Sequence, residues 1–184
     1  MTSQSSDEYT YELKVPKERI AVLIGKQGEV KSLIEESTKT KLNIDSKEGD
    51  ITISGKDALQ LYCCREIIRA IARGFNPDIA LKLLKQDMTL EIISIEGYSG
   101  GPKDVERLRG RVIGEGGKSR KLIEEITESA VSVYGKTVAI ISDYEGVAIA
   151  RRAVESLLTG SQHANVYKWL EKQRAELNKK RMMM

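Results

Sequence analysis

The chain has few of the residues from which metal sites and catalytic centres are commonly built. Its 184 residues include one histidine and two cysteines, and the cysteines, Cys63 and Cys64, are adjacent. Adjacent cysteines cannot form an ordinary disulfide with each other, and no second pair exists to complete a zinc site. The single histidine, His163, excludes a histidine-based metal site and a Ser-His-Asp triad, and we expect it to start a helix. The sequence therefore predicts no metal, no cofactor and no enzymatic activity.

Long apolar runs and aromatic residues are scarce as well. No apolar run approaches the roughly 20 residues that span a bilayer, and the N-terminus lacks the basic start and apolar core of a signal peptide. We therefore expect a cytoplasmic protein that has no membrane partner. Aromatic residues make up 5% of the chain, so aromatic platforms for stacking nucleic-acid bases should not dominate. The net charge of +3 is too modest to indicate a polyanionic partner by itself.

One twelve-residue stretch is present twice. It reads Leu-Ile-Gly-Lys-Gln-Gly-Glu-Val-Lys-Ser-Leu-Ile from Leu23 and Val-Ile-Gly-Glu-Gly-Gly-Lys-Ser-Arg-Lys-Leu-Ile from Val112. In both copies two aliphatic residues precede Gly-x-x-Gly, and a helical pattern follows it. Glycine permits backbone angles and close approach that a Cβ prevents, and the first amides of the following helix have no intrahelical partner. Such a loop can hold an anion. One isolated copy would be explained equally by a plain helix-turn-helix connection, but the duplication favours a binding role.

The pattern around each loop predicts the same order of elements, so the chain is expected to hold two small domains. We expect a strand, a short helix, the glycine loop, a second helix, two strands and a long closing helix in each. These elements are predicted at 9–15, 17–24, 29–38, 41–45, 50–54 and 56–73, and again at 88–95, 104–113, 118–128, 130–134, 137–141 and 144–158. A short helix at 79–84 lies between the two sets, and a flexible loop at 97–103 interrupts the second set after its first strand.

The spacing of the glycines locates a deletion in the second copy. Gly25 and Gly114 are 89 residues apart, whereas Gly74 and Gly160, which we expect to end the long helices, are 86 residues apart. The second copy has therefore lost about three residues. The shortest explanation is a tighter turn between its last two strands, at Gly135-Lys136.

This order of elements resembles the K-homology (KH) domain in its type I form, in which two strands and a final helix follow the glycine loop. The resemblance implies an α+β fold of two tandem type I KH domains, each a three-stranded antiparallel sheet covered by helices, plus a C-terminal helix. It places the domains at 9–87 and 88–160, after a disordered start at 1–8 and before a basic helix at 161–184. It also implies that a single strand of RNA or DNA lies in a groove between the short helices and the adjoining strand, with the glycine loop against its backbone.

The second half shows a closer resemblance. Its segments Ser-Val-Tyr-Gly-Lys-Thr-Val-Ala-Ile-Ile at 132–141 and His-Ala-Asn-Val-Tyr-Lys-Trp-Leu-Glu at 163–171 are similar to the "partner of Nob one" family of small-subunit assembly proteins. That resemblance implies binding of single-stranded RNA at the 3′ end of small-subunit ribosomal RNA. The implied partners are the pre-ribosomal small subunit and a Nob-one-type endonuclease. The intact first loop, Gly25-Lys26-Gln27-Gly28, fits an archaeal member better than a eukaryotic one.

The residues expected to contact RNA lie in and around the two loops. In the first unit, Lys26 in the loop and Lys31 one turn beyond it can meet phosphates. In the second unit Glu115 departs from a basic loop, but cations on both sides should keep the local field positive. For Arg107 and Arg120 a solvated helix face is an equal interpretation. The full predicted set is Ile24, Gly25, Lys26, Gln27, Gly28, Lys31, Arg109, Arg111, Ile113, Gly114, Glu115, Gly116, Gly117, Lys118, Arg120, Lys121 and Lys136, the last closing the groove from the short turn.

Two features leave alternatives open. Six aliphatic residues are candidates for a groove floor that meets the bases, although packing in the core is the simpler interpretation of each; they are Ile24, Val30, Ile44, Ile113, Leu122 and Val133. The tail is the second feature. Residues 166–181 have a helical pattern, and six basic and two acidic residues from Ser161 to Met184 give a charge of +4. This helix either packs on the second unit or extends the RNA surface.

Enzyme interpretations fail on the sequence, and two functions remain. The second loop superficially resembles a nucleotide-binding P-loop, but the first glycine of that motif would have to stand at Val112, and a helical pattern rather than a strand precedes the loop. The paired glutamates after each loop, Glu35 with Glu36 and Glu124 with Glu125, are expected at exposed helix positions and do not cluster as nuclease metal ligands do. The chain is then either an RNA-binding assembly factor or an adaptor. In an adaptor, one unit, such as the second with its Glu115, docks a nuclease or a translation factor.

Overall fold

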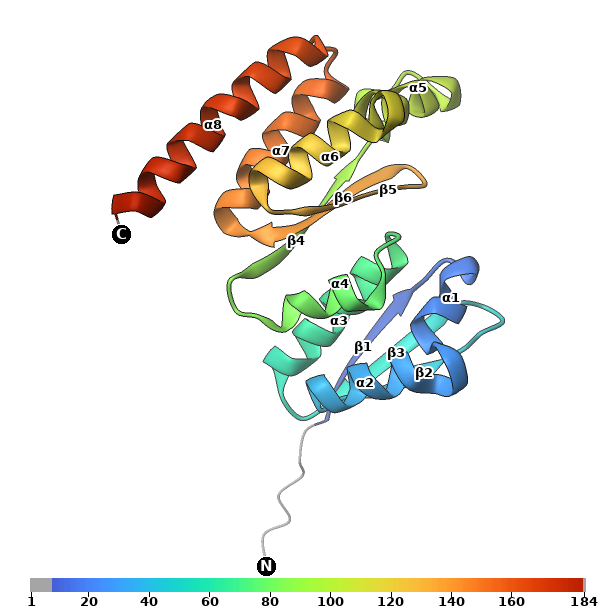
Figure 1. The fold of residues 1–184 in the computed structure, drawn as a ribbon. Coiled ribbons are helices and arrows are strands. Elements are labelled where there is room, and N and C mark those ends of the chain that lie inside the picture. Colours follow the sequence, from blue (N-terminus) through green and yellow to red (C-terminus); the bar gives the residue numbers. More distant parts are fainter. Residues whose placement is uncertain (1–7, 184) are drawn as a thin grey trace, which may run out of the picture. The chain divides into compact units, whose positions relative to one another are not determined.

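The computed structural model describes residues 8–183, and the chain divides into two compact units between Gln86 and Asp87. Of the predicted disordered start at 1–8, only Glu8 is among the described residues. The two units share one architecture, a three-stranded antiparallel sheet whose central strand is the last in sequence, which confirms the predicted α+β fold (Figure 1). Within residues 8–183 no helix combines the length and the apolar character needed to cross a membrane.

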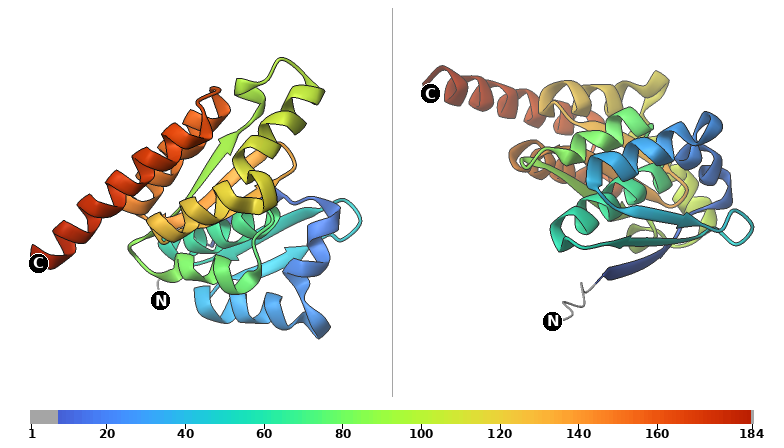
Figure 2. Two further views of the ribbon diagram at one scale, coloured as in Figure 1. Left: turned by 45° about the horizontal axis from the view of Figure 1, so that its top comes forward. Right: turned by 90° about the horizontal axis from the view of Figure 1, so that it is seen from below.

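In the first unit the helices α1, α2 and α3 cover the sheet (Figure 2). The strands run in the order β1-β3-β2 and are β1 (Tyr9–Lys14), β2 (Lys41–Ile44) and β3 (Asp50–Gly55). The helical elements are α1 (Lys17–Ile24), the 3₁₀ turn η1 (Lys26–Gly28), α2 (Glu29–Thr38), α3 (Ala58–Ala72), α4 (Pro77–Ala80) and the 3₁₀ turn η2 (Leu81–Leu84). The predicted start of α3 at Lys56 is wrong, because the Asp57 carboxylate caps the helix by accepting the amides of Leu59 and Gln60.

The second unit repeats the plan and adds one long helix. Its strands run in the order β4-β6-β5 and are β4 (Met88–Ser94), β5 (Ala130–Tyr134) and β6 (Thr137–Asp143). The helical elements are η3 (Glu96–Tyr98), α5 (Pro102–Ile113), η4 (Glu115–Gly117), α6 (Lys118–Thr127), α7 (Tyr144–Leu158) and α8 (His163–Met183). The predicted loop at 97–103 is only partly a loop. It contains η3, and α5 begins at Pro102, where the missing proline amide costs no hydrogen bond.

The predicted deletion lies where the sequence places it. Five residues separate Ile44 at the end of β2 from Asp50 at the start of β3, and Ile44 pairs with Ile51. Two residues, Gly135 and Lys136, separate β5 from β6, where Tyr134 pairs with Thr137. The second hairpin is thus three residues shorter, and both long helices end before a glycine of positive φ, Gly74 at 98° and Gly160 at 100°.

The tail packs on the second unit. Val166 and Leu170 of α8 belong to the same buried cluster as Val154 of α7 and Ile123 of α6. α7 and α8 lie side by side in Figure 2, and α8 contacts α6 as well. Outside this core, Arg174 of α8 forms an ion pair of 3.2 Å with Glu125 of α6. Packing of the tail on the second unit is therefore confirmed, and this packing is compatible with a role of α8 in the RNA surface.

Candidate nucleic-acid interface

The two Gly-x-x-Gly loops follow the same backbone path. The first glycine has φ 73° in Gly25 and 74° in Gly114, and the fourth has φ 84° in Gly28 and 80° in Gly117. The third position is left-handed in both loops, at φ 54° in Gln27 and at 58° where the second loop has glycine. A residue with a side chain pays about 1–2 kcal/mol in that conformation. The sequence repeat is therefore a structural repeat that persists even where it strains the chain.

Only the first glycine of each loop is enclosed. A Cβ on Gly25 would lie 2.5 Å from Val30 Cγ2 and 2.8 Å from the Val30 amide nitrogen, and one on Gly114 would lie 2.5 Å from Ser119 Oγ and 2.8 Å from the Ser119 amide nitrogen. A Cβ on Gly116 would meet no heavy atom within 4 Å. The start of the loop is thus packed on the following helix, while its middle faces solvent. Such a surface lets another backbone approach closely.

The aliphatic residues beside the loops are partly exposed. All six floor candidates are half-buried, and two of them, Leu122 and Val133, also pack against the core of the second unit, as the simpler interpretation expects; the six are Ile24, Val30, Ile44, Ile113, Leu122 and Val133. Leu122 lines a hollow of about 330 Å³ together with Gly116, Lys118 and Lys121. Leu33 of α2, at the position equivalent to Leu122 in the repeat, is 44% exposed. Each unit therefore presents apolar surface next to cations and an open loop.

The paired glutamates are not simply exposed. Glu35 and Glu124 are half-buried, and each accepts a backbone amide from the strand that follows its helix. Glu35 Oε1 accepts from Leu42 at 2.7 Å, and Glu124 Oε1 accepts from Val131 at 2.8 Å. The prediction of exposed positions is therefore wrong for the first glutamate of each pair. These bonds tie α2 to β2 and α6 to β5, which are the two sides of the expected groove.

The lysines and arginines beside the two loops differ in exposure and in their ion-pair partners. Lys26, Lys118 and Lys121 are exposed, and Lys31 is half-buried. Arg107 pairs with Asp104 at 2.6 Å, Arg120 with Glu124 at 3.6 Å, and Lys136 with Glu96 at 2.6 Å. The pKa of Asp104 is held below its ordinary value, first by the hydrogen bond from the Gly100 amide and then by Arg107. The exposed lysines therefore provide the positive field at the loops with the fewest competing partners.

Arg111 serves the fold. Its Nε donates to the Leu157 carbonyl at 2.9 Å and its Nη2 donates to the Ser161 carbonyl at 2.5 Å, so it holds the C-terminal end of α7. In the first unit Arg19 does the same, with Nε 2.8 Å from the Ile71 carbonyl and Nη2 2.7 Å from the Phe75 carbonyl. Arg109 is half-buried, and in the described part of the chain its buried Nε has no hydrogen-bond partner. Arg109 and Arg111 are thus both half-buried, unlike the exposed lysines.

Two residues of α8 reach the second loop, and sequence reasoning did not count them as site residues. Tyr167 and Ser119 share a hydroxyl–hydroxyl hydrogen bond of 2.6 Å, and Ser119 is fully buried directly behind the loop. His163 Nε2 lies 2.9 Å from the Arg111 carbonyl at the end of α5. Both residues stand in the segment 163–171 that carried the family resemblance. The similarity of that segment to the family is the sequence signal that could have identified His163 and Tyr167 as site residues.

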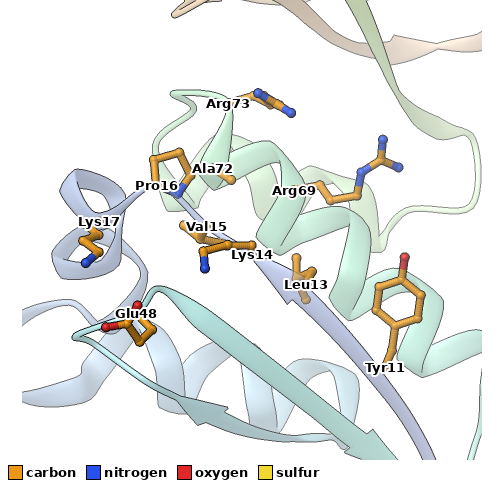
Figure 3. Close-up of a pocket in the computed structure, with 10 residues that line it drawn as sticks. All are labelled: Tyr11, Leu13, Lys14, Val15, Pro16, Lys17, Glu48, Arg69, Ala72 and Arg73. Carbon is orange, nitrogen blue, oxygen red and sulfur yellow. The ribbon is translucent and has the colours of Figure 1, made fainter.

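A separate hollow of about 480 Å³ lies on the first unit, between β1 and α3 (Figure 3). Leu13 and Tyr11 of β1 and Arg69 of α3 line it, together with Arg73 just after α3, and Glu48 lies at one side. None of the loop residues lines it. Within residues 8–183 no cluster of His, Cys, Asp and Glu has a geometry that could hold a metal ion. The loop surfaces are therefore the sites on which sequence repeat, open backbone and positive charge coincide.

Comparison with protein families gives two matches. A family model described as a eukaryotic-type KH domain of type I matches residues 89–175, and a KH-domain model matches residues 10–70. A KH domain-containing protein of Methanocaldococcus jannaschii is 51% identical over 173 residues, covering 92% of this chain and 76% of that protein. The pre-rRNA-processing protein PNO1 of Chaetomium thermophilum is 27% identical, covering 86% of this chain and 63% of PNO1. The chain thus spans less than two thirds of that eukaryotic relative.

Solved structures agree with these matches. Dim2p from Pyrococcus horikoshii superimposes with a TM-score of 0.84 at 45% identity, covering 89% of this chain and 99% of Dim2p. A chain of the a/eIF2alpha-aDim2p-rRNA complex from the same organism superimposes with a TM-score of 0.88 at 42% identity, covering 94% and 98% of the two chains. At these identities the likeness extends to sequence as well as fold.

Proposed function

The chain belongs to the KH-domain family that includes archaeal Dim2p and PNO1, and from this premise we propose that it binds single-stranded RNA at its two loop surfaces. Its target is the 3′ end region of small-subunit ribosomal RNA, and it acts in ribosome assembly and rRNA maturation. Its partners are the pre-ribosomal small subunit and a Nob-one-type endonuclease, and it acts in the cytoplasm. Support for an rRNA target comes from the relative that was crystallised in a complex with rRNA.

The observation that carries the proposal is the duplication of one complete surface. Each unit combines an open Gly-x-x-Gly backbone, exposed or half-buried lysines beside it and half-buried aliphatic side chains next to both. A single strand can place its phosphates on the amides and lysines and its bases on the aliphatic floor. A duplex cannot, because its bases are stacked inside. Single-stranded nucleic acid is therefore the ligand that fits.

Within each surface the residues divide by role. Lys26 and Lys31 in the first unit, and Lys118 and Lys121 in the second, meet phosphates. The glycines let the strand approach, and the six aliphatic residues meet bases. Glu35 and Glu124 hold the walls together by their bonds to the strand amides. Arg111 acts through the fold, because its guanidinium is engaged by carbonyls of its own unit.

Two weak sites on one chain reinforce each other. If one RNA strand reaches both grooves, binding at the first raises the effective concentration at the second. Affinity for a long strand should then exceed affinity for a strand that fills one groove only. A strand of four nucleotides is the length that one groove of this kind holds, so it serves as the single-site reference.

The test is binding of the purified chain to three labelled oligonucleotides over a salt series. One copies the small-subunit rRNA 3′ end, one has the same composition in scrambled order, and one is the DNA version. We expect preference for the first with a shallow dependence of affinity on salt, because base contacts persist when phosphates are screened. Equal binding of all three with a steep salt dependence would contradict an rRNA target, and binding of none would contradict the function.

A further inference from the structure

We propose that α8 completes a phosphate pocket behind the second glycine loop, and that this pocket takes a phosphodiester of the RNA strand lying in the second groove. The inference rests on the proposed function and extends it, because it places a contact outside the groove and on an element beyond the repeated architecture. The pocket has a volume of about 450 Å³. Its walls come from α5, the loop with the start of α6, and α8.

The charge of the lining suits an anion. Three cationic side chains and one carboxylate line the pocket, namely Arg107, Arg111, Lys118 and Glu115. Arg107 is 60% exposed, and only its Nε and Nη2 are used by Asp104. A guanidinium carries five N–H donors, so Arg107 keeps donors in a planar arrangement that matches two oxygens of a phosphate. Lys118 adds a mobile point charge.

The walls are fixed before any ligand arrives. His163 lies 2.9 Å from the Arg111 carbonyl, and Tyr167 shares its hydroxyl with buried Ser119 at 2.6 Å. The same Tyr167 ring lies 5.7 Å from the Lys118 ammonium, which gives that cation a favourable place at the pocket. Val166 and Leu170 anchor the helix in the core. Binding therefore has to order little besides the ends of two side chains.

The pocket supplies positive charge that the second loop lacks. Where the first loop has Lys26, the second has Glu115, whose carboxylate disfavours a nearby phosphate. Arg107 and Lys118 lie on the two helices that flank this loop, so the positive charge missing from the loop is supplied beside it. In the first unit α3 is followed by the short elements α4 and η2 instead of a long helix. The structure thus places the extra wall in the unit whose loop is acidic.

A second contact of α8 points the same way. Glu125 lines the hollow in front of the loop with Lys118 and Lys121, where its carboxylate would repel RNA. Arg174 of α8 lies 3.2 Å from that carboxylate and offsets its charge. α8 therefore supplies a wall of the pocket and also offsets an acidic side chain near the second loop.

The experiment replaces one backbone phosphate at a time. Oligonucleotides carrying a single neutral methylphosphonate at successive positions are bound to the full chain, to Arg107→Ala and to Lys103→Ala. Lys103 is exposed on the same helix α5 but does not line the pocket, so its variant loses the same charge elsewhere. We expect Arg107→Ala to bind severalfold more weakly and to lower the slope of log affinity against log salt by ~0.7.

The decisive result is that one phosphate of the RNA depends on Arg107. A methylphosphonate at that position should weaken binding to the natural chain and to Lys103→Ala. It should not change binding to Arg107→Ala, because that variant already lacks the contact between Arg107 and the phosphate. A loss caused only by altered folding would be the same at every position. If no position couples to Arg107 while RNA still binds, the pocket proposal is overturned and the proposed function stands. Competition by inorganic phosphate at equal concentration would instead identify a free-phosphate site, which also overturns it.

Discussion

Charge reversal in either glycine loop should weaken RNA binding without unfolding the protein. Replacing Lys26 and Gln27 by aspartate changes the first loop by three charge units, and replacing Gly116 and Lys118 by aspartate changes the second by the same amount. All four residues are exposed. The two double variants are therefore matched, and each tests one unit while leaving the other intact.

The magnitude follows from the charges. Two unit charges ~5 Å apart interact by ~0.8 kcal/mol at the dielectric constant of water. Three units acting on one phosphate amount to ~2.5 kcal/mol, or ~70-fold in affinity. The structural cost is small, because Gln27 already holds a side chain at φ 54° and a Cβ at Gly116 meets no heavy atom within 4 Å. Aspartate tolerates left-handed angles better than most residues, so about 1 kcal/mol is expected at Gly116.

Fluorescence anisotropy with a labelled single strand measures the affinity, and a thermal melt followed by circular dichroism checks the fold. Each variant should melt within a few degrees of the natural chain and bind far more weakly. A folded variant whose affinity stays within about twofold of the natural chain would refute the role of that loop. If this happened only in the second loop, an adaptor role for that unit would gain support.

Three further outcomes follow from the contacts. Gly114→Ala should destabilise the second unit by more than ~2 kcal/mol in denaturant titrations, because the new Cβ would lie 2.5 Å from Ser119 Oγ. Gly116→Ala should cost only about 1 kcal/mol, and equal effects of the two substitutions would contradict the packing argument. Glu35→Ala should cost ~1.5 kcal/mol through the lost bond to the Leu42 amide, and Glu36→Ala, on the exposed neighbour, less than ~0.5; a thermal melt with no difference would refute that bond. Burial raises the pKa of both cysteine thiols, but Cys64 is fully buried and Cys63 only half-buried, so iodoacetamide at pH ~8 should label Cys63 first in mass spectra; early labelling of Cys64 would disprove its burial.

Much of the fold follows from local patterns. The predicted bounds of the helix before the first loop, the helix after it and the closing helix at 144–158 agree with α1, α2 and α7. Apolar periodicity and the flanking glycines determine these elements, and both are visible in a single sequence. The short second hairpin is predicted by counting residues between glycines. Starts of helices are predicted less accurately, because a single residue at the boundary decides them: the Asp57 carboxylate caps α3, and Pro102 stands in the first turn of α5.

The missing parts depend on partners distant in sequence. Arg111 bonds to carbonyls 46 and 50 residues away, so no local pattern distinguishes it from an arginine that faces RNA. Glu35 is turned toward the Leu42 amide by the connection between α2 and β2, which helical spacing does not reveal. Tyr167 becomes a neighbour of the second loop only because α8 folds back onto α6. Each of these contacts is a product of tertiary packing.

The most direct measurement is a titration of the ¹⁵N-labelled chain with the single-stranded rRNA 3′-end oligonucleotide, followed by amide shifts in NMR spectra. The account predicts the largest shifts in both loops, at residues 25–28 and 114–117, with smaller ones along β2 and β5. Amides around the hollow of Figure 3, such as those of Leu13 and Arg69, should stay in place. Shifts centred on that hollow, with both loops unmoved, would contradict the claim that the glycine loops bind RNA.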